Sequence, residues 1–219
     1  MSVIAPFWTY RVRLILTSSS SSIRVVGLAL MLLTAGRCVA EPGAERPTTD
    51  SIFNGRDLTG WKTPEGAFWR VEDGVLVGEN DAAKKGSMLY TEQSYRDVVF
   101  ETEVRFEGEI DSGIMFRRPE LQVQIGVSRS LKRDMTCSFY TGRYPEEAQA
   151  RRAGELLKPN AWNHLRIEAR GDTFTVWLNG EQVSRYTDSK YAGAGPIGLQ
   201  IHAGLPMKVE FRTIRAAAL

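Results

Sequence analysis

Apolar and polar residues alternate along most of the chain after about residue 50. In the stretch from Val98 to Phe106, Phe100, Val104 and Phe106 alternate with charged residues. A period of two is typical of strands that bury one side and expose the other. Similar patterns predict further strands at residues 69–71, 75–78, 87–90, 113–117, 121–125, 138–140, 165–169, 173–178, 183–186, 197–202 and 208–214.

Residues that favour turns separate these predicted strands. Asn179-Gly180, for example, lies between two of them and is a strong hairpin signal. Only residues 145–157 have a composition that predicts a helix, within a long connection. About a dozen short, regularly spaced strands indicate an all-β fold of two antiparallel sheets, a sandwich or jelly roll, rather than a βαβ fold.

The first 40 residues have a different pattern. Arg11, Arg13 and Arg24 precede the apolar run 25–35, and small residues stand at 38 and 40. This order predicts a signal peptide cleaved after Ala40, and hence export to the periplasm or secretion. The apolar run is too short to span a bilayer, so no membrane insertion is expected after cleavage. Residues 41–50 are predicted to be a flexible lead-in, and 51–219 a single domain.

Cleavage would change the charge and the cysteine content. Residues 1–40 carry four basic residues and no acidic one, so the net charge of +2 would become −2. A basic surface for nucleic acid is therefore not expected. Cys38 would leave with the leader, and Cys137 would have no intrachain disulfide partner. No sequence feature indicates a lowered thiol pKa at Cys137, so it is not predicted to be a nucleophile.

Strand parity predicts one polar face. Residues i and i+2 of a strand share a face, so outward polar residues of neighbouring strands should converge. Long amides, an arginine and a histidine suit a hydroxyl-rich ligand because they supply directional donors and acceptors. A nearby tyrosine could stack on a sugar ring. The predicted face comprises Arg117, Gln122, Gln124, Gln200 and His202, with Tyr140 close by.

Simpler interpretations remain open for each of these residues. The glutamines could form an ordinary solvated face, Arg117 could be a surface charge, and His202 could cap a loop. Trp61 and Trp69 are expected in core or edge packing, whereas Trp177 has outward parity and could be a ligand platform or edge packing.

Motifs for other chemistries are absent from the sequence. It has no glycine-rich phosphate loop, no serine elbow and no zinc-ligand spacing. Asp111 and Asp134 could join a calcium site, but their pattern is too weak to assign one, so no cofactor is predicted.

Several segments, in order from Ser51 to the C-terminus, resemble the 3-keto-disaccharide hydrolase domain family. The resemblance implies a concanavalin-like jelly roll and a secreted or periplasmic protein that acts on carbohydrate. The matching segments are 53–61, 69–76, 111–117, 123–125, 158–163, 178–180, 195–202 and 209–215.

The family implies cleavage of glycosides that are already oxidised at C3. The ketone acidifies the C2 hydrogen, so that one base removes this proton and the C1 substituent leaves by elimination. Water can then add, which makes the net reaction a hydrolysis. Carried onto this chain, the resemblance implies His202 as the base and Arg117 as the enolate stabiliser. Gln122, Gln124, Gln200 and Tyr140 would bind the sugar.

One position departs from the family pattern. Family members often carry an acidic residue where this chain has Gln122. An amide cannot act as a base, so the role would fall to His202 or to a carboxylate such as Glu101 or Glu103. The alternative is a domain that only binds carbohydrate.

Three functions therefore remain open: an enzyme acting on 3-keto-glycosides, a lectin-like binding domain, and a protein-interaction sandwich. His202 beside Arg117 in a concave groove would favour the enzyme. A groove lined by Trp177 and Tyr140, with His202 turned away, would favour binding alone. A flat face would favour protein interaction.

Overall fold

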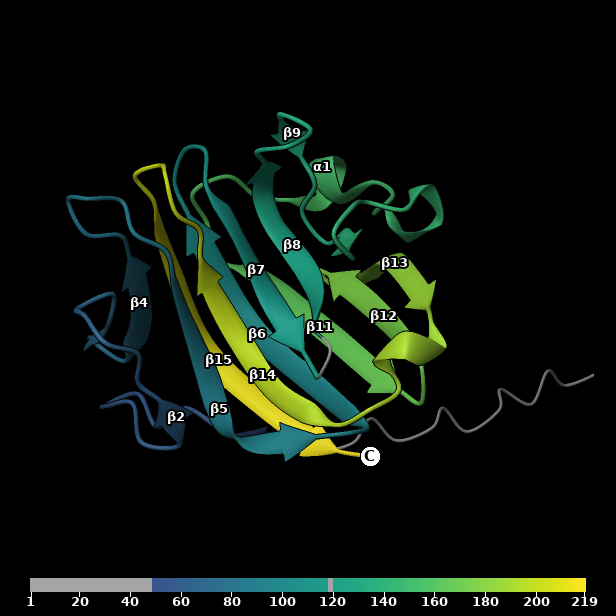
Figure 1. Ribbon diagram of the computed structural model, residues 1–219, viewed down its shortest axis with the longest axis horizontal. Coiled ribbons are helices and arrows are strands. Elements are labelled where there is room, and N and C mark those ends of the chain that lie inside the picture. The colour runs from purple at the N-terminus through teal and green to yellow at the C-terminus, as the bar shows by residue number, and fades with distance from the viewer. Residues whose placement is uncertain (1–48, 118–119) are drawn as a thin grey trace, which may run out of the picture. The chain divides into compact units, whose positions relative to one another are not determined.

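The computed structural model describes residues 49–117 and 120–219, which fold into two stacked β-sheets (Figure 1). The sheets confirm the expected all-β class and the concanavalin-like jelly-roll architecture. The predicted signal peptide, residues 1–40, lies outside the described residues, as does most of the lead-in. Both stay predictions.

Sheet A is the rear sheet in Figure 1 and has the strand order β13-β12-β11-β6-β15-β4-β3, with β1 paired to β15. The strand pairs of this sheet are antiparallel. Its strands are β1 (Asp50–Ser51), β3 (Trp69–Glu72), β4 (Val75–Glu79), β6 (Val98–Phe106), β11 (Asn163–Arg170), β12 (Thr173–Leu178), β13 (Glu181–Thr187) and β15 (Lys208–Ala218).

Sheet B faces the viewer in Figure 1 and has the order β10-β8-β7-β14-β5-β2, with β9 paired to β8. It is also antiparallel throughout. Its strands are β2 (Trp61–Lys62), β5 (Ser87–Tyr95), β7 (Asp111–Phe116), β8 (Leu121–Ser128), β9 (Arg133–Asp134), β10 (Phe139–Tyr140) and β14 (Gly195–Ile201).

Helical structure is sparse, and the short helix predicted within residues 145–157 is present. The connection after β10 contains the 3₁₀ turn η1 (Glu146–Ala148) and the single-turn α1 (Ala153–Leu156). Arg152, between them, has a left-handed φ of 59°, which interrupts a continuous helix. A further 3₁₀ turn, η2 (Ser189–Tyr191), precedes β14. Within 49–117 and 120–219, no helix is long and apolar enough to cross a membrane.

The core lies between the two sheets and follows the strand parity. Phe116 of sheet B packs edge-to-face on Phe100 and Phe174 of sheet A, with ring centroids 5.9 and 6.3 Å apart. Trp61 and Trp69 are buried, as expected for core residues. Cys137 is also fully buried, and burial raises the pKa of its thiol. With one face of sheet B committed to the core, its other face is left for a ligand.

Candidate functional site

The outer face of sheet B carries two adjacent rows of side chains that cross several strands. Strand pairing places Tyr140, Gln122, Met115, Gly198 and Tyr90 opposite one another in the first row. Opposed residues of antiparallel strands share a face, so the five positions form a continuous strip.

The second row lies two residues further along each strand. It contains Gln124, Gly113, Gln200 and Met88, again joined by direct pairing. The two rows bring Gln122, Gln124 and Gln200 together, as parity predicted.

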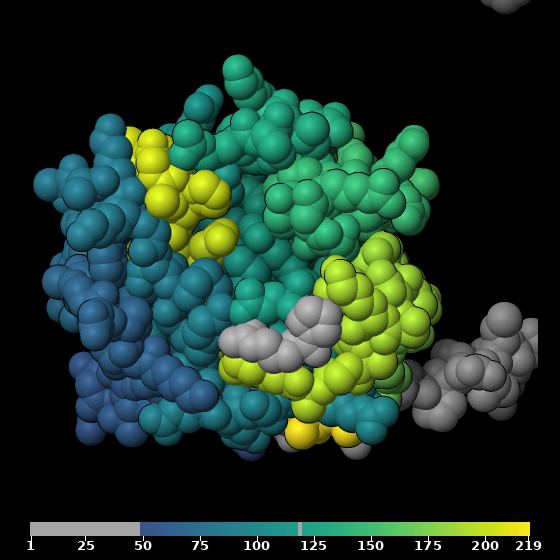
Figure 2. Space-filling view, in the orientation of Figure 1, coloured from purple at the N-terminus to yellow at the C-terminus, as the bar shows by residue number. Residues whose placement is uncertain are grey.

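These glutamines lie in a polar cavity of about 220 Å³. Figure 2 shows the hollow, with a teal floor between the yellow segment near residue 200 and the green segment near residue 140. Five of the six predicted site residues line it, and Arg117 does not. Its lining is Asp111, Gln122, Gln124, Ser128, Arg129, Ser130, Tyr140, Tyr144, Gln200 and His202.

A chain of amide hydrogen bonds fixes the cavity floor. The side-chain nitrogen of Gln122 donates to the amide oxygens of Gln124 (2.7 Å) and Gln200 (3.3 Å). Gly113 makes room for this arrangement, since a Cβ there would fall 2.6 Å from Nε2 of Gln122. Because the nitrogen of Gln122 is directed at its neighbours, its carbonyl oxygen is the group it can present to a sugar hydroxyl.

Asp111 fixes this floor at one side of the cavity. It is 5% exposed; one carboxylate oxygen accepts from the side-chain nitrogen of Gln124 (2.8 Å) and the other from the backbone N–H of Arg129 (3.2 Å). The carboxylate therefore orients two neighbours. Its parity with Gly113 and Met115 on β7 could have placed it on this face from the sequence.

His202 and Arg129 meet on one backbone oxygen at the cavity wall. The carbonyl of Ala203 accepts from Nδ1 of His202 and from Nη1 of Arg129, each at 2.7 Å. The two donor nitrogens therefore lie no more than twice that distance apart. Because Nδ1 carries the donated hydrogen, the neutral imidazole has its lone pair on Nε2 and can accept a proton there.

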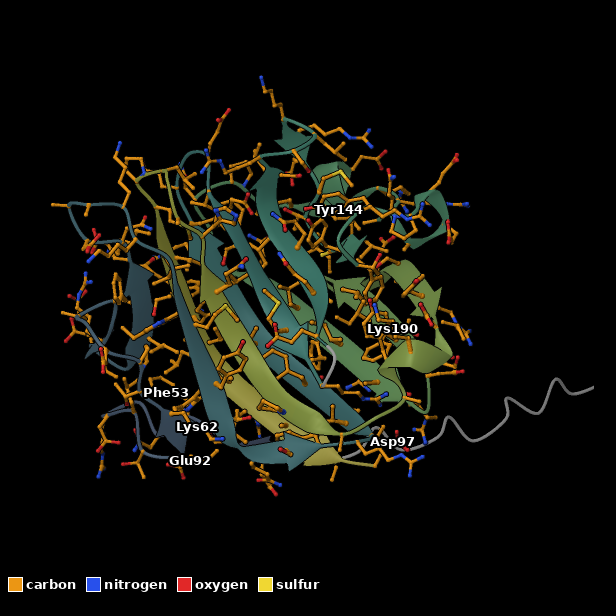
Figure 3. The ribbon with its side chains drawn as sticks, in the orientation of Figure 1. Phe53, Lys62, Glu92, Asp97, Tyr144 and Lys190 are labelled. Carbon is orange, nitrogen blue, oxygen red and sulfur yellow. The ribbon has the colours of Figure 1, made fainter. Side chains whose placement is uncertain are left out.

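Two tyrosines close the cavity at the end near β10. The rings of Tyr140 and Tyr144 are 4.9 Å apart, tilted by 50°. Figure 3 shows Tyr144 beyond the upper part of β8. Burial raises the pKa of Tyr144 to about 12, so its hydroxyl stays protonated at neutral pH and can donate a hydrogen bond.

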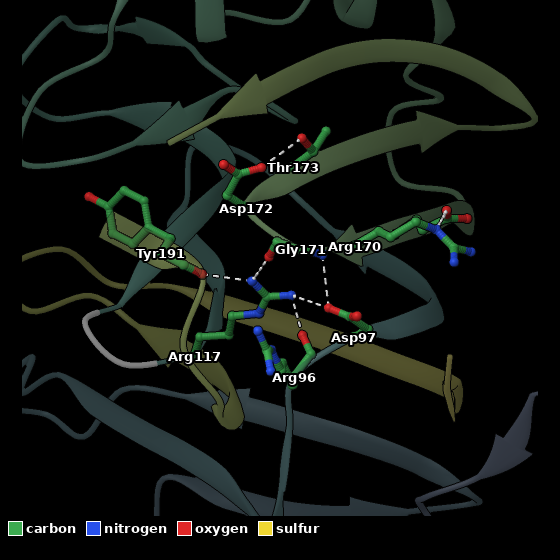
Figure 4. A network of polar contacts seen from close by, with 9 residues as sticks. Arg96, Asp97, Arg117, Arg170, Gly171, Asp172, Thr173 and Tyr191 are labelled. Carbon is green, nitrogen blue, oxygen red and sulfur yellow. Dashed lines mark hydrogen bonds and ion pairs between the residues drawn. The ribbon is translucent and has the colours of Figure 1, made fainter. Parts of the chain in front are cut away.

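Arg117 is not on this face, which corrects the sequence interpretation. Its guanidinium is buried on the other side of sheet B and donates to the backbone carbonyls of Arg96, Gly171 and Tyr191 (Figure 4). It also pairs with Asp97 at 3.2 Å and lies 4.7 Å from the ring centre of Phe174.

Backbone conformation explains why parity failed at Arg117. Its φ is +64°, so the strand alternation ends at Phe116 and no longer predicts where the next side chain points. The cation in the cavity is instead Arg129, from the loop after β8. Loop residues such as Arg129 and Tyr144 have no periodic signal, so strand parity could not predict them.

Other candidates lie elsewhere. Glu101 and Glu103, considered as alternative bases, lie on sheet A and pair with Arg166 and Arg212, outside the cavity. Trp177 is also on sheet A, where Arg166 lies 5.5 Å from its ring centre.

The two aspartates considered for calcium do not share a site. Asp134 accepts hydrogen bonds from Thr136 and lines a different depression from Asp111. In the part of the chain that the structure describes, no group of three or more His, Cys, Asp or Glu side chains could hold a metal ion.

Several solved structures share this fold. Two from Parabacteroides distasonis, provisionally described as glycosyl hydrolases, are 21% and 26% identical to the chain, with TM-scores of 0.59 and 0.57. Both alignments cover 78% of this chain, and 94% and 84% of theirs. A β-glucanase of Bacillus licheniformis is 13% identical, with a TM-score of 0.58 over 76% of this chain and 96% of its own.

Sequence comparison gives a more specific result. Residues 48–217 match the family described as the 3-keto-alpha-glucoside-1,2-lyase-like domain. No protein of curated function matches the chain.

Proposed function

Since the chain belongs to the 3-keto-alpha-glucoside-1,2-lyase-like domain family, we propose that it cleaves 3-keto-glycosides in the cavity of sheet B. The observation that carries the proposal is the placement of His202 and Arg129 on one carbonyl, at the wall of a cavity with an amide floor. This combination supplies one base, one cation and several groups that bind hydroxyls.

The proposed reaction begins with proton transfer to His202. A ketone at C3 of the sugar acidifies the C2 hydrogen, and Nε2 of His202 accepts this proton. The electrons of the C2–H bond move into the C2–C3 bond, and the ketone oxygen becomes an enolate. Arg129 would stabilise this negative charge, the role that the family resemblance implied for Arg117.

The second step releases the C1 substituent. The enolate re-forms the ketone as the C1–O bond breaks, which leaves a double bond between C1 and C2. The departing oxygen takes a proton, for which the imidazolium of His202 is the donor we propose. Addition of water to the double bond would make the net reaction a hydrolysis. Only one base is required, unlike the two carboxylates of most glycosidases.

The amide floor would orient the sugar for this reaction. Gln122, Gln124 and Gln200 are linked to one another, so they would bind hydroxyls without first losing conformational freedom. Export through the leader predicted in residues 1–40 would bring the domain to sugars outside the cytoplasm.

The test compares oxidised and unoxidised substrates. The protein is incubated with a 3-keto-α-glucoside and, separately, with the parent glucoside, and sugar release and enone absorbance are followed. Release from the ketone alone is the expected result. Binding of either sugar without turnover would contradict the proposal and support the lectin-like alternative. Cleavage of the unoxidised glucoside would show an ordinary glycosidase.

A further inference from the structure

The first row of sheet B continues beyond the cavity. From Gln122 it passes through Met115 and Gly198 to Tyr90 on β5, and then to Lys62 on β2, near the lower left edge of Figure 3. From β8 to β5 are three strand spacings, about 14 Å. This is longer than one sugar ring. Met115, between Gln122 and Tyr90, is only 5% exposed, so a second ring would lie on top of a closed floor there.

The cavity itself is small. Its volume of about 220 Å³ lies below the roughly 300 Å³ at which pockets for drug-sized ligands begin. It has room for one sugar ring rather than two. Tyr140 and Tyr144 close the end near β10, so a second ring would extend along the row in the opposite direction, toward Tyr90.

The ring of Tyr90 reaches over Gly198 because that neighbouring position has no side chain. A Cβ on Gly198 would fall 2.6 Å from a ring carbon of Tyr90 and 3.3 Å from Cβ of Met115. The ring therefore occupies the space over β14. Its hydroxyl donates to a carboxylate oxygen of Glu120 at 2.5 Å, across the strands that separate them. The half-buried ring is thus supported from below and fixed at its tip.

From this geometry, and building on the proposed function, we infer that Tyr90 is the platform for the second sugar ring, the group that leaves from C1. A fixed aromatic ring offers the apolar face of a pyranose a stacking surface at low entropic cost. Glu120 would accept hydrogen bonds from hydroxyls of the same ring. The keto-sugar would lie beside His202, and the leaving sugar beside Tyr90. Tyr90 would then set the preference for a sugar over a small alcohol as the group that leaves from C1.

The experiment measures kcat/KM for two substrates, a 3-keto α-linked glucose disaccharide and methyl 3-keto-α-glucoside. The wild-type protein should prefer the disaccharide. Tyr90→Ala should lower kcat/KM for the disaccharide about tenfold, the equivalent of about 1.4 kcal/mol, and leave the methyl glycoside nearly unchanged. Tyr90→Phe keeps the ring and should retain most of the preference.

Trp177→Ala is the matched control, because it removes a half-buried aromatic ring from sheet A. Trp177→Ala should change kcat/KM for neither substrate. Thermal unfolding of each variant shows whether the fold is intact. If Tyr90→Ala lowered kcat/KM equally for both substrates, or for neither, Tyr90 would not be a platform for the second ring.

A binding measurement separates this inference from the proposed function. The affinities for the unoxidised disaccharide and for methyl α-glucoside are obtained by NMR titration of the same variants. If the wild-type protein cleaves neither ketone, the proposed function fails, and the affinity ratio alone decides the platform. If Tyr90→Ala binds the two sugars with similar affinity, the role of Tyr90 as a platform is supported. If the variant keeps the wild-type ratio of the two affinities, that role is rejected.

Discussion

His202 gains its proposed role from one hydrogen bond to the main chain. Because Nδ1 is occupied by the carbonyl of Ala203, the imidazole has a fixed tautomer and a fixed orientation. A side-chain partner such as a carboxylate would require a particular residue type, whereas a carbonyl belongs to every residue. The sequence could therefore predict the histidine but not how it is held.

Replacement of His202 tests the base directly. His202→Ala should lower kcat/KM on a 3-keto-glucoside by about 10²- to 10⁴-fold, the usual contribution of a general base, with little change in thermal stability. His164→Ala is the control, since His164 is exposed on sheet A. Steady-state kinetics on both variants provide the measurement. Full activity of His202→Ala would show that His202 is not the base.

Arg117 should matter for stability instead. Three backbone carbonyls and Asp97 converge on its guanidinium, and burial lowers the pKa of that group although Asp97 opposes the shift. Arg117→Met leaves those partners without their donor and should cost about 3 to 5 kcal/mol in urea unfolding. The folded variant should keep its kcat. A large loss of kcat with unchanged stability would restore the catalytic role expected from the sequence.

At the scale of strands, periodicity predicted most of the fold. β6 and β12 have the predicted bounds, and the predicted hairpin turn at Asn179-Gly180 joins β12 to β13. Alternation is a property of regular strands, so its predictions hold while φ stays extended. They fail where the strand ends at Arg117, and they say nothing about the loops that supply Arg129 and Tyr144.

The contact between β7 and β8 provides an element-scale prediction. Gly113→Ala places a Cβ 2.6 Å from Nε2 of Gln122, so the amide floor must shift while the strands stay paired. We expect a rise in KM of about tenfold for a 3-keto-glucoside, equivalent to one lost hydrogen bond. Gly154→Ala, on α1, is the control because a Cβ there meets nothing within 4 Å. Equal KM values for the two variants would contradict this role of Gly113.

Sheet A should make the protein sensitive to acid. Hydrogen bonds from Arg212 lower the pKa of Glu103, and those from Arg105 lower the pKa of Glu210. A carboxylate with a lowered folded pKa stabilises the fold above its unfolded pKa, near 4.5, and this stabilisation is lost as the pH falls further. Urea unfolding from pH 7 to pH 3 should show this loss.

A variant separates this pair from general acid unfolding. Arg212→Gln should make the pH dependence below 4.5 shallower, because Glu103 then titrates closer to its ordinary value. Arg152→Gln removes an exposed pair with Glu155 on α1 and should leave the slope unchanged. The same slope in both variants would show that the Arg212 pair contributes nothing to acid sensitivity.

Across the whole molecule, the two sheets have separate tasks. Sheet A carries a lattice of arginine–glutamate pairs on its outer face, and sheet B carries amides, tyrosines and one histidine. The sandwich itself was predictable, because the core depends on alternation that any apolar side chains can satisfy. The site was less predictable, because its cation, Arg129, comes from a loop and the acceptor that holds His202 is a main-chain oxygen.

The shared carbonyl of Ala203 implies an uneven tolerance to mutation along three consecutive residues. No side chain at 203 can remove a main-chain oxygen, and Ala203 is exposed, so most substitutions there should be accepted. Gly204 has a φ of +89°, and a Cβ there would meet the guanidinium of Arg129. A saturation library selected on a 3-keto-disaccharide should therefore be permissive at 203 and restrictive at both 202 and 204. Related sequences of this domain should then vary at position 203 and keep the residues at 202 and 204, although the acceptor oxygen belongs to residue 203.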